Sequence, residues 1–482
     1  HQGRRWLFAS TLDALARAEG VRLTLRAEAL EQLIRTMRIP APATIYREAW
    51  ALPAGTMLVI DEESQAKAFR WADDFPKEVN SLMSFDEAVH EAMRALDASV
   101  RRRLIGDRPL GVFLSGGVDS SLIAESAMRA AGHVRTFSVR FAGAEGGFDE
   151  SAYAAEVARA IGAEHEVLDV RPQALEALEE LAEALDQPLG NSTALPMLLL
   201  ARTARAHTVV ALHGVGGDEL FAGYPRHFGF VWHAMLHRAI GWPVWGKLAA
   251  RMADAADARN LRGRIRRWLA ALSDPPARAY RRWLAAWDEA DVPIVELEAQ
   301  PSAPPVPLPD PLAEGGGLEA WLERLDPLHA AMLYDVREYL AHDLLVLADR
   351  TTMHWGLELR APFLCPRLYQ LAFAAHFRLH LSPWHPERGL KRLLKAVAQR
   401  RLPKSVWARP KQGFMLPIRQ WFAGELAGKV AGLAAPKAKL AGLVRLDFRR
   451  RVVGEHQSGR DRSDVLWTLL LLEAWLVRRG LV

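Results

Sequence analysis

Residues 115–121 read Ser-Gly-Gly-Val-Asp-Ser-Ser, directly after the apolar run 110–114 and before the helix-like segment 122–130. A buried strand that passes through two glycines into a helix is typical of a loop that binds pyrophosphate. Gly116 and Gly117 let the backbone approach the anion, and free N–H groups at the helix start supply partial positive charge. The loop is not a Walker loop, since no Gly-Lys-Ser/Thr follows it.

The polar side chains of this loop also suit a nucleotide phosphate. Ser115, Ser120 and Ser121 carry hydroxyls that can donate hydrogen bonds to phosphate oxygens. Asp119 can hold the Mg²⁺ that accompanies a nucleotide phosphate. The alternative is an ordinary glycine turn of an α/β domain, but strand, double glycine, acid and hydroxyls would then coincide in this order by chance. We therefore predict a pyrophosphate-binding loop.

Length and composition indicate an ordinary globular protein. The 482 residues are enough for two or three domains, and 50% of them are apolar and 25% charged. The net charge of +5 and the pI of about 9.4 fit either a polyanionic partner such as RNA or an arginine-rich solvated surface. We favour the solvated surface and expect no nucleic-acid partner.

Cysteine usage and hydropathy indicate a cytoplasmic protein. The single cysteine, Cys365, excludes an intrachain disulfide and a cysteine-based zinc site, and fits a reducing compartment. No secretory signal is seen at the start. The most apolar stretch, 465–472, is too short to span a bilayer and indicates a buried C-terminal helix. We expect no membrane partner.

Strands and helices alternate in the first half of the chain, after a helix that Ser84 and Glu87 begin with a capping box. The expected strands are 110–114, 134–139, 164–170 and 208–212, and the expected helices are 119–131, 150–161, 173–185 and 195–206. Such alternation predicts an α/β fold with a doubly wound, mainly parallel sheet, whose ligands lie beyond the carboxyl ends of the strands. The C-terminal region from 318 is predicted to be helical, and the proline- and glycine-rich segment 300–317 to be a flexible insertion.

A second glycine loop complements the first. The apolar run 208–212 leads into residues 213–219, which read His-Gly-Val-Gly-Gly-Asp-Glu. Asp119 and Asp218 would lie at neighbouring strand ends, where two carboxylates could grip one Mg²⁺. The alternative is that Asp218 and Glu219 only cap a helix. We favour the metal role for Asp218 and the structural role for Glu219.

Six further segments carry a family resemblance. Residues 115–121 resemble the PP-loop of N-type ATP pyrophosphatases, and the chain from about residue 80 onward resembles the glutamine-hydrolysing asparagine synthetase family. The segments that match in order and spacing are 136–139, 149–153, 214–224, 349–353, 358–364 and 409–414. The resemblance implies a ligase domain over residues 80–482 with a PP-loop α/β fold.

The resemblance also implies an ATP site. Phe113 and Val139 would flank the adenine, with His213 and Gly214 beside the adenosine. The pyrophosphate would lie on Ser115, Gly116, Gly117, Ser120 and Ser121, with magnesium on Asp119 and Asp218.

Further residues are implied near the reacting groups. Lys411 matches the family's lysine near the reacting phosphate, where an ammonium neutralises charge as pyrophosphate departs; the alternative is a solvated loop lysine. Asp349, Arg350 and Arg360 either shape the acceptor pocket or brace helices, and both interpretations stay open. His213 is expected to contribute backbone contacts rather than catalysis by its imidazole.

The implied reaction is ATP-dependent amide formation in amino-acid biosynthesis. A small carboxylate, aspartate or a related acid, attacks the α-phosphorus of ATP, and ammonia or glutamine-derived nitrogen then displaces AMP from the acyl-adenylate. Two alternatives remain: a catalytically impaired or regulatory paralogue that binds nucleotide, and an RNA-modifying PP-loop enzyme. Some RNA-modifying PP-loop enzymes add sulfur to tRNA, and these thiolases need additional catalytic cysteines, which this chain lacks.

Two features depart from the family pattern. Val215 stands where the family typically has glutamate, so the natural acceptor and nitrogen donor are left open. Residues 1–75 resemble the C-terminal remnant of a class II glutamine amidotransferase domain with the Ntn-type αββα fold, without its nucleophilic cysteine. We expect ammonium but not glutamine to support amide formation. The oligomeric state is also open, with a homodimer as one option.

Overall fold

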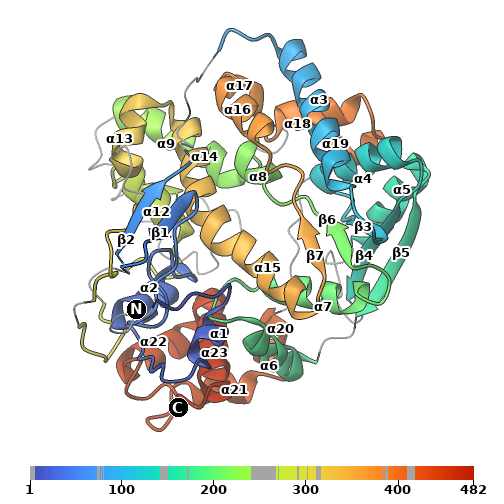
Figure 1. Ribbon diagram of the computed structural model, residues 1–482. Helices are drawn as coiled ribbons and strands as arrows, with labels where there is room; N and C mark the ends of the chain where they lie inside the picture. Colours follow the sequence, from blue (N-terminus) through green and yellow to red (C-terminus); the bar gives the residue numbers. More distant parts are fainter. Residues whose placement is uncertain are drawn as a thin grey trace.

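The structure is a computed structural model. It describes residues 6–63, 65–72, 76, 79, 81–141, 150–170, 173–239, 268–269, 271–289, 292–300, 302–310, 316–382, 384–385, 389–409 and 418–482. Figure 1 shows a sheet with helices on both of its faces and a group of helices from the end of the chain below it.

A five-stranded parallel sheet organises the chain, in the order β5-β4-β3-β6-β7. Its strands are β3 (Leu110–Phe113), β4 (Arg135–Phe141), β5 (Glu164–Val170), β6 (Val210–Leu212) and β7 (Glu358–Arg360). The chain runs outward from β3 on one side and from β6 on the other, so the order reverses between these two strands. The prediction of a parallel α/β sheet is confirmed, and a ligand site is expected at this reversal.

Helices cover both faces of the sheet. On one face lie α4 (Val118–Ala131) and α5 (Ser151–Ile161), with α3 (Phe85–Arg103) packed on α4; on the other lie α7 (Ala194–Ala204) and α15 (Leu345–His354). Each face therefore has its own apolar core, as a doubly wound sheet requires. The predicted capping box is confirmed, because Ser84 accepts from the Glu87 N–H and Glu87 accepts from the Ser84 N–H.

Most of the remaining chain is helical. The other helices are α6 (Ala174–Ala184), α8 (Gly217–Leu220), α9 (Pro225–Ala239), α12 (Pro276–Leu284), α13 (Gly317–Arg324), α14 (Pro327–Tyr334), the π-helix η1 (Asp335–Leu344), α16 (Pro366–Ala374), α17 (Phe377–His380), α18 (Arg392–Gln399), α19 (Lys404–Ala408), α20 (Ile418–Ala423), α21 (Ala427–Gly432), α22 (Leu446–Gln457) and α23 (Ser463–Arg478). The stretch 465–472 lies in α23, which packs on α6 and on the N-terminal helix α2 (Ala27–Thr36), so its prediction as a buried helix is confirmed. Of the expected insertion, residues 302–310 are irregular, and 301 and 311–315 lie outside the described residues.

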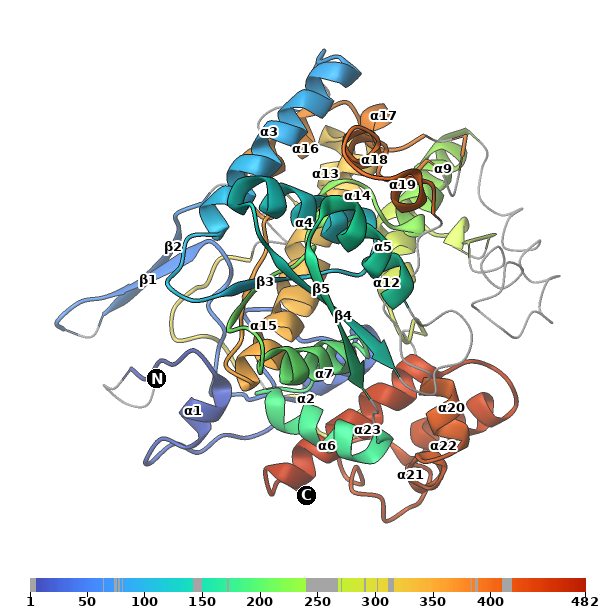
Figure 2. The ribbon, with the colours of Figure 1, turned by 90° about the vertical axis from the view of Figure 1, so that its right-hand side faces the viewer.

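The N-terminal segment contains two short helices and a hairpin. They are α1 (Leu12–Ala16), α2 (Ala27–Thr36) and the antiparallel strands β1 (Thr56–Ile60) and β2 (Ala66–Arg70). The opening run 4–10 has the sequence pattern of a strand and predicts one, but residues 6–10 are irregular and pair with no described strand. The hairpin projects from the rest of the molecule (Figure 2).

A buried ion pair attaches this segment to the π-helix η1. Arg38 Nε lies 3.0 Å from Glu338 Oε1, and the two side chains are 2% and 5% exposed. We expect Arg38→Ala to lower the free energy of unfolding by about 3–5 kcal/mol, because it leaves a buried carboxylate without its partner. Urea unfolding measures the change. Arg140→Ala, at the half-exposed pair with Asp169, serves as the control and should cost about 1 kcal/mol or less; equal losses would contradict the prediction.

Candidate active site

The two glycine loops meet at one edge of the sheet. The first connects β3 to α4 and the second connects β6 to α8; β3 and β6 are neighbouring parallel strands. The loops touch at Asp119 in the first turn of α4. A Cβ atom on Gly217 would lie 2.7 Å from Asp119 Cγ, and one on Gly214 would lie 3.0 Å from Asp119 Cβ. The second loop therefore needs glycine where it passes the first.

Two glycines hold the loops in conformations that other residues adopt rarely. Gly116 has φ +73°, and a Cβ there would lie 2.7 Å from Tyr153 Cβ. Gly216 has φ +93°, and a Cβ there would lie 2.3 Å from Leu364 Cδ2. Left-handed backbone and close neighbours together explain the glycines that the sequence pattern contains.

The hydroxyls of the first loop face one another. Ser115 Oγ lies 3.0 Å from Ser120 Oγ, the Ser115 N–H donates to Ser120 Oγ at 3.2 Å, and the Gly117 N–H donates to Ser115 Oγ. The turn thus gathers hydroxyls and backbone donors ahead of the first turn of α4. Ser121 is fully buried, so its side chain lies beneath this surface.

The residues expected around adenosine lie beside the loops. Phe113 and Val139 are buried on β3 and β4, and the Phe113 ring meets the His213 ring edge-on, with 6.3 Å between centroids. The Val215 N–H donates to His213 Nδ1 at 3.2 Å, so the ring accepts at Nδ1. Burial lowers the pKa of His213 to about 4. The imidazole is therefore neutral at neutral pH.

Sequence reasoning missed a lysine at the centre of the site. Lys391 Nζ lies 2.8 Å from Asp218 Oδ1 and also contacts Asp119 Oδ2, so one ammonium joins both predicted metal ligands. Burial acts to lower the pKa of Lys391, but the charges of Asp119 and Asp218 outweigh it and raise the pKa above its ordinary value. The ammonium is therefore charged at neutral pH.

The backbone around Lys391 is specialised for this contact. Lys391 has φ +51° and immediately precedes α18. The aliphatic chain of Lys391 passes over Gly223, where a Cβ would lie 2.2 Å from Lys391 Cε and 1.8 Å from Asp218 Oδ1. Only glycine leaves room for both side chains. In the sequence, Lys391 stands in an ordinary run before an apolar helix, and no local signal marks it.

A buried polar layer lies behind the second loop. Tyr224 donates its O–H to Glu219 in the core, where burial and then the charge of Asp218 raise the pKa of Glu219 to about 7. Asp335, the first residue of the π-helix, accepts from Arg226 at 2.8 Å and lies 2.8 Å from His227 Nε2. π-Helical turns occur frequently at functional sites. This layer holds Glu219, the residue that follows Asp218, in the core.

Four other residues that the sequence analysis named are not seen to contact Asp119, Asp218 or Lys391. Asp349, Arg350 and Arg360 make other contacts, and Lys411 is not among the described residues. Arg360 donates two 2.7 Å hydrogen bonds to backbone carbonyls at the end of α3. Arg350 is paired with Asp186 at 3.0 Å and with Asp349 at 2.7 Å. These contacts brace the fold.

The donor set fits a hard divalent cation. Asp119 and Asp218 both contact the same Nζ, so their carboxylates converge on one point, and carboxylate oxygens are what Mg²⁺ prefers. Among the described residues, no group of three or more His, Cys, Asp and Glu side chains converges. Such an ion would complete its coordination with phosphate oxygens and water.

Among the residues that the structure describes, no helix is long and apolar enough to cross a membrane.

Comparisons with known proteins agree with this geometry. The asparagine synthase family profile matches residues 91–477. A Mycobacterium tuberculosis protein, provisionally named a glutamine-hydrolysing asparagine synthetase, is 30% identical over 93% of this chain and 67% of its own length. A Bacillus subtilis asparagine synthetase is 26% identical over 97% of this chain and 71% of its own length, and a Penicillium rubens amidase is 22% identical over 79% and 60%. The chain belongs to the asparagine synthase family of ATP-dependent, amide-forming enzymes.

Proposed function

We propose that this chain activates a small carboxylic acid with ATP and converts it into an amide, releasing pyrophosphate and AMP. One observation carries the proposal: Lys391 joins Asp119 and Asp218 where the two glycine loops meet, at the reversal of strand order. This arrangement concentrates opposite charges beside a turn of backbone donors. It suits a polyphosphate and its counter-cation better than a neutral ligand.

Activation is needed because a carboxylate is a poor electrophile with a poor leaving group. Attack of the acid's oxygen on the α-phosphorus breaks the bond to pyrophosphate and forms an acyl-adenylate. A nitrogen nucleophile then attacks the acyl carbon, loses a proton and expels AMP. The protein's contribution is to position the reactants and to balance the charge that accumulates on the phosphates.

The first loop supplies the pyrophosphate contacts in this proposal. The hydroxyls of Ser115 and Ser120, which now face each other, would turn to phosphate oxygens together with the N–H groups at the start of α4. Asp119 and Asp218 would hold Mg²⁺, which supplies charge neutralisation at the phosphate oxygens. Lys391 lies at the same edge, and its ammonium can balance the departing pyrophosphate. Lys411 has the same proposed task by family resemblance.

Adenosine is proposed to lie against β3 and β4. Phe113 and Val139 give this side an apolar wall, and the neutral imidazole of His213 stands across from Phe113. A neutral ring neither attracts nor repels the phosphates, so His213 would orient the nucleoside by packing and through its backbone.

The acceptor is proposed to be aspartate or a related acid. Val215 is half-buried in the second loop, and its side chain can neither accept a proton nor carry a charge. One relative is named an amidase rather than an asparagine synthetase. Both facts support the proposal that members of the family act on different carboxylic acids.

Residues 1–75 are proposed to be the C-terminal part of an Ntn-type glutaminase domain. The hairpin supports this proposal, because Met57, Val59 and Phe69 expose apolar side chains, and the register of the two strands places them on one face. Cys365, the chain's one cysteine, is buried at the start of α16 in the ligase part, so we do not propose it as a glutaminase nucleophile. For this chain we propose ammonia as the nitrogen donor; the cytoplasmic location and the homodimer stay predictions.

ATP–pyrophosphate exchange over a panel of carboxylic acids tests the function. We expect exchange that requires both Mg²⁺ and one acid of the panel, because adenylation is reversible before nitrogen arrives. The acid that supports exchange names the acceptor, and the reaction without acid is the control. Absence of exchange with every acid, while ATP still binds, would overturn the proposal in favour of a catalytically impaired nucleotide-binding protein.

A further inference from the structure

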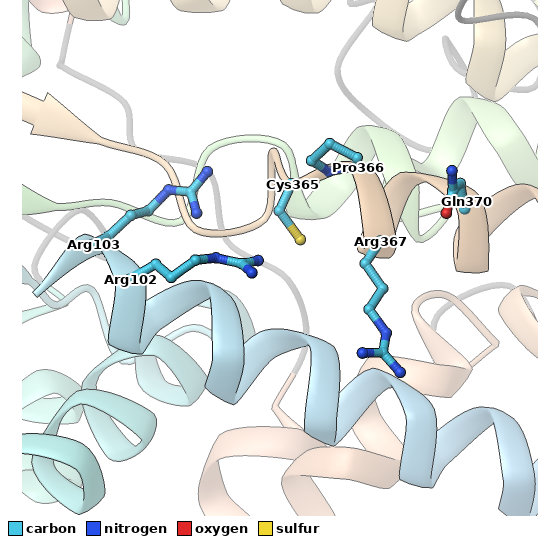
Figure 3. A pocket seen from close by; sticks show the side chains of 6 residues that line it. All are labelled: Arg102, Arg103, Cys365, Pro366, Arg367 and Gln370. Atoms are coloured by element: carbon cyan, nitrogen blue, oxygen red, sulfur yellow. The ribbon is translucent and has the colours of Figure 1, made fainter.

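A cavity lined by three arginines lies away from the glycine loops. It has a volume of about 560 Å³ and lies between the end of α3 and the start of α16. Its lining residues are Arg102, Arg103, Cys365, Pro366, Arg367 and Gln370. Figure 3 shows Arg102 and Arg103 reaching from α3 toward the turn that holds Cys365, and Arg367 extending from α16 toward α3. None of the residues assigned to the ATP site lines it.

The positive charge of this cavity is largely unbalanced. Arg102 makes no hydrogen bond or ion pair with any residue that the structure describes. Arg103 donates to Ser99 Oγ at 2.7 Å and to the Leu364 carbonyl at 3.2 Å, which are neutral acceptors. Among the three arginines, Arg367 has a described carboxylate partner, Glu91 at 2.5 Å.

The surroundings of Arg103 show the effect of this imbalance. Burial lowers the pKa of Arg103; the neighbouring Cys365 acts to raise it, and the charges of Arg102 and Arg360 act to lower it further. An anion in the cavity would face two guanidinium groups that have no carboxylate partner among the described residues, and it would relieve their mutual repulsion.

We propose that this cavity binds a small anion that carries a phosphate group. Arg102 and Arg103 supply guanidinium groups from α3, while Arg367 lines the cavity from α16 and keeps its ion pair with Glu91. Guanidinium groups bind phosphate with paired N–H donors. A phosphate group has more oxygens than a single carboxylate, so it can accept paired N–H bonds from two neighbouring guanidinium groups at once. The volume is also that of a small-molecule site.

Calorimetric titration with inorganic phosphate, in a chloride buffer of low ionic strength, tests the proposal. We expect saturable binding to the wild-type protein and at least about tenfold weaker binding to Arg102→Glu, because the change reverses a charge within the cavity. Arg101→Glu is the matched control: Arg101 is exposed in the same turn of α3 but does not line the cavity. Its affinity should stay within about twofold of wild type.

These variants and a second ligand distinguish this cavity from the ATP site and from the general charge of the surface. Equal weakening by Arg101→Glu and Arg102→Glu would show general charge attraction and overturn the proposal, as would the absence of saturable binding to wild type. Arg102 does not line the first glycine loop, so phosphate affinity that Arg102→Glu leaves unchanged would place the anion outside this cavity and overturn the proposal. Citrate binding more tightly than phosphate would overturn the choice of phosphate.

Discussion

Asp119→Asn is expected to lower ATP–pyrophosphate exchange about 10³-fold, to near the limit of detection. Asparagine keeps the size of aspartate, so it still fits between Gly214 and Gly217, whose backbones approach Asp119 closely. It removes the negative charge that meets Lys391 and that would hold Mg²⁺. The loops keep their shape, while the site loses its means of neutralising the phosphates. Exchange is measured with the acid that the panel identifies.

A matched substitution separates chemistry from stability. Asp97→Asn makes the same chemical change at a partly buried aspartate of α3 that pairs with Arg401 at 2.7 Å, outside the site. This variant should lose some stability but retain exchange. Asp218→Asn should follow Asp119→Asn. An unchanged exchange rate in Asp119→Asn would remove Asp119 from the mechanism.

Lys391→Met is expected to lower exchange by about 10²-fold and to destabilise the protein without nucleotide by about 2 kcal/mol. Methionine keeps the length of the side chain over Gly223, but Asp119 and Asp218 then face each other without a cation. Mg²⁺ should restore much of the lost stability, because it can take the place of the ammonium between the carboxylates. Thermal unfolding with and without Mg²⁺ measures this recovery.

Lys404→Met, at the start of α19, is the control for Lys391→Met. It makes the same chemical change at an exposed lysine, so Mg²⁺ should not change its stability beyond the wild-type response. A Lys391→Met protein that Mg²⁺ stabilises no more than this control would show that the two aspartates do not form a cation site.

The sequence predicted the elements around the first loop well, because their signals are local. The strands and helices between residues 110 and 212 begin and end within about two residues of the expected bounds. β7 was not predicted, since Glu358 and Arg360 are polar and the strand is only three residues long. It becomes a strand by pairing with β6, which lies far away in the sequence. The segment 6–10 shows the converse: a strand-like pattern that pairs with no described strand is irregular.

The same distinction holds for the site. The glycines, hydroxyls and aspartates of the two loops stand in short motifs, so their meeting followed from the parallel order of β3 and β6. Lys391, just before α18, reaches Asp119 across 272 residues of the chain, and Asp335 approaches Arg226 across 109 residues. Such contacts arise only from tertiary packing. They have no periodicity or spacing from which they could be predicted.

The position of Lys391 has a consequence for the order in which ligands assemble. A tethered ammonium competes for the two carboxylates at a high effective concentration, whatever the amount of free metal in solution. A metal ion without nucleotide must displace the Lys391 ammonium from the carboxylates, and it offers that ammonium no other partner. A metal–nucleotide complex brings phosphates that give the displaced ammonium a new counter-charge. The site should therefore load its metal together with the nucleotide, so that Lys391 makes metal binding conditional on the substrate.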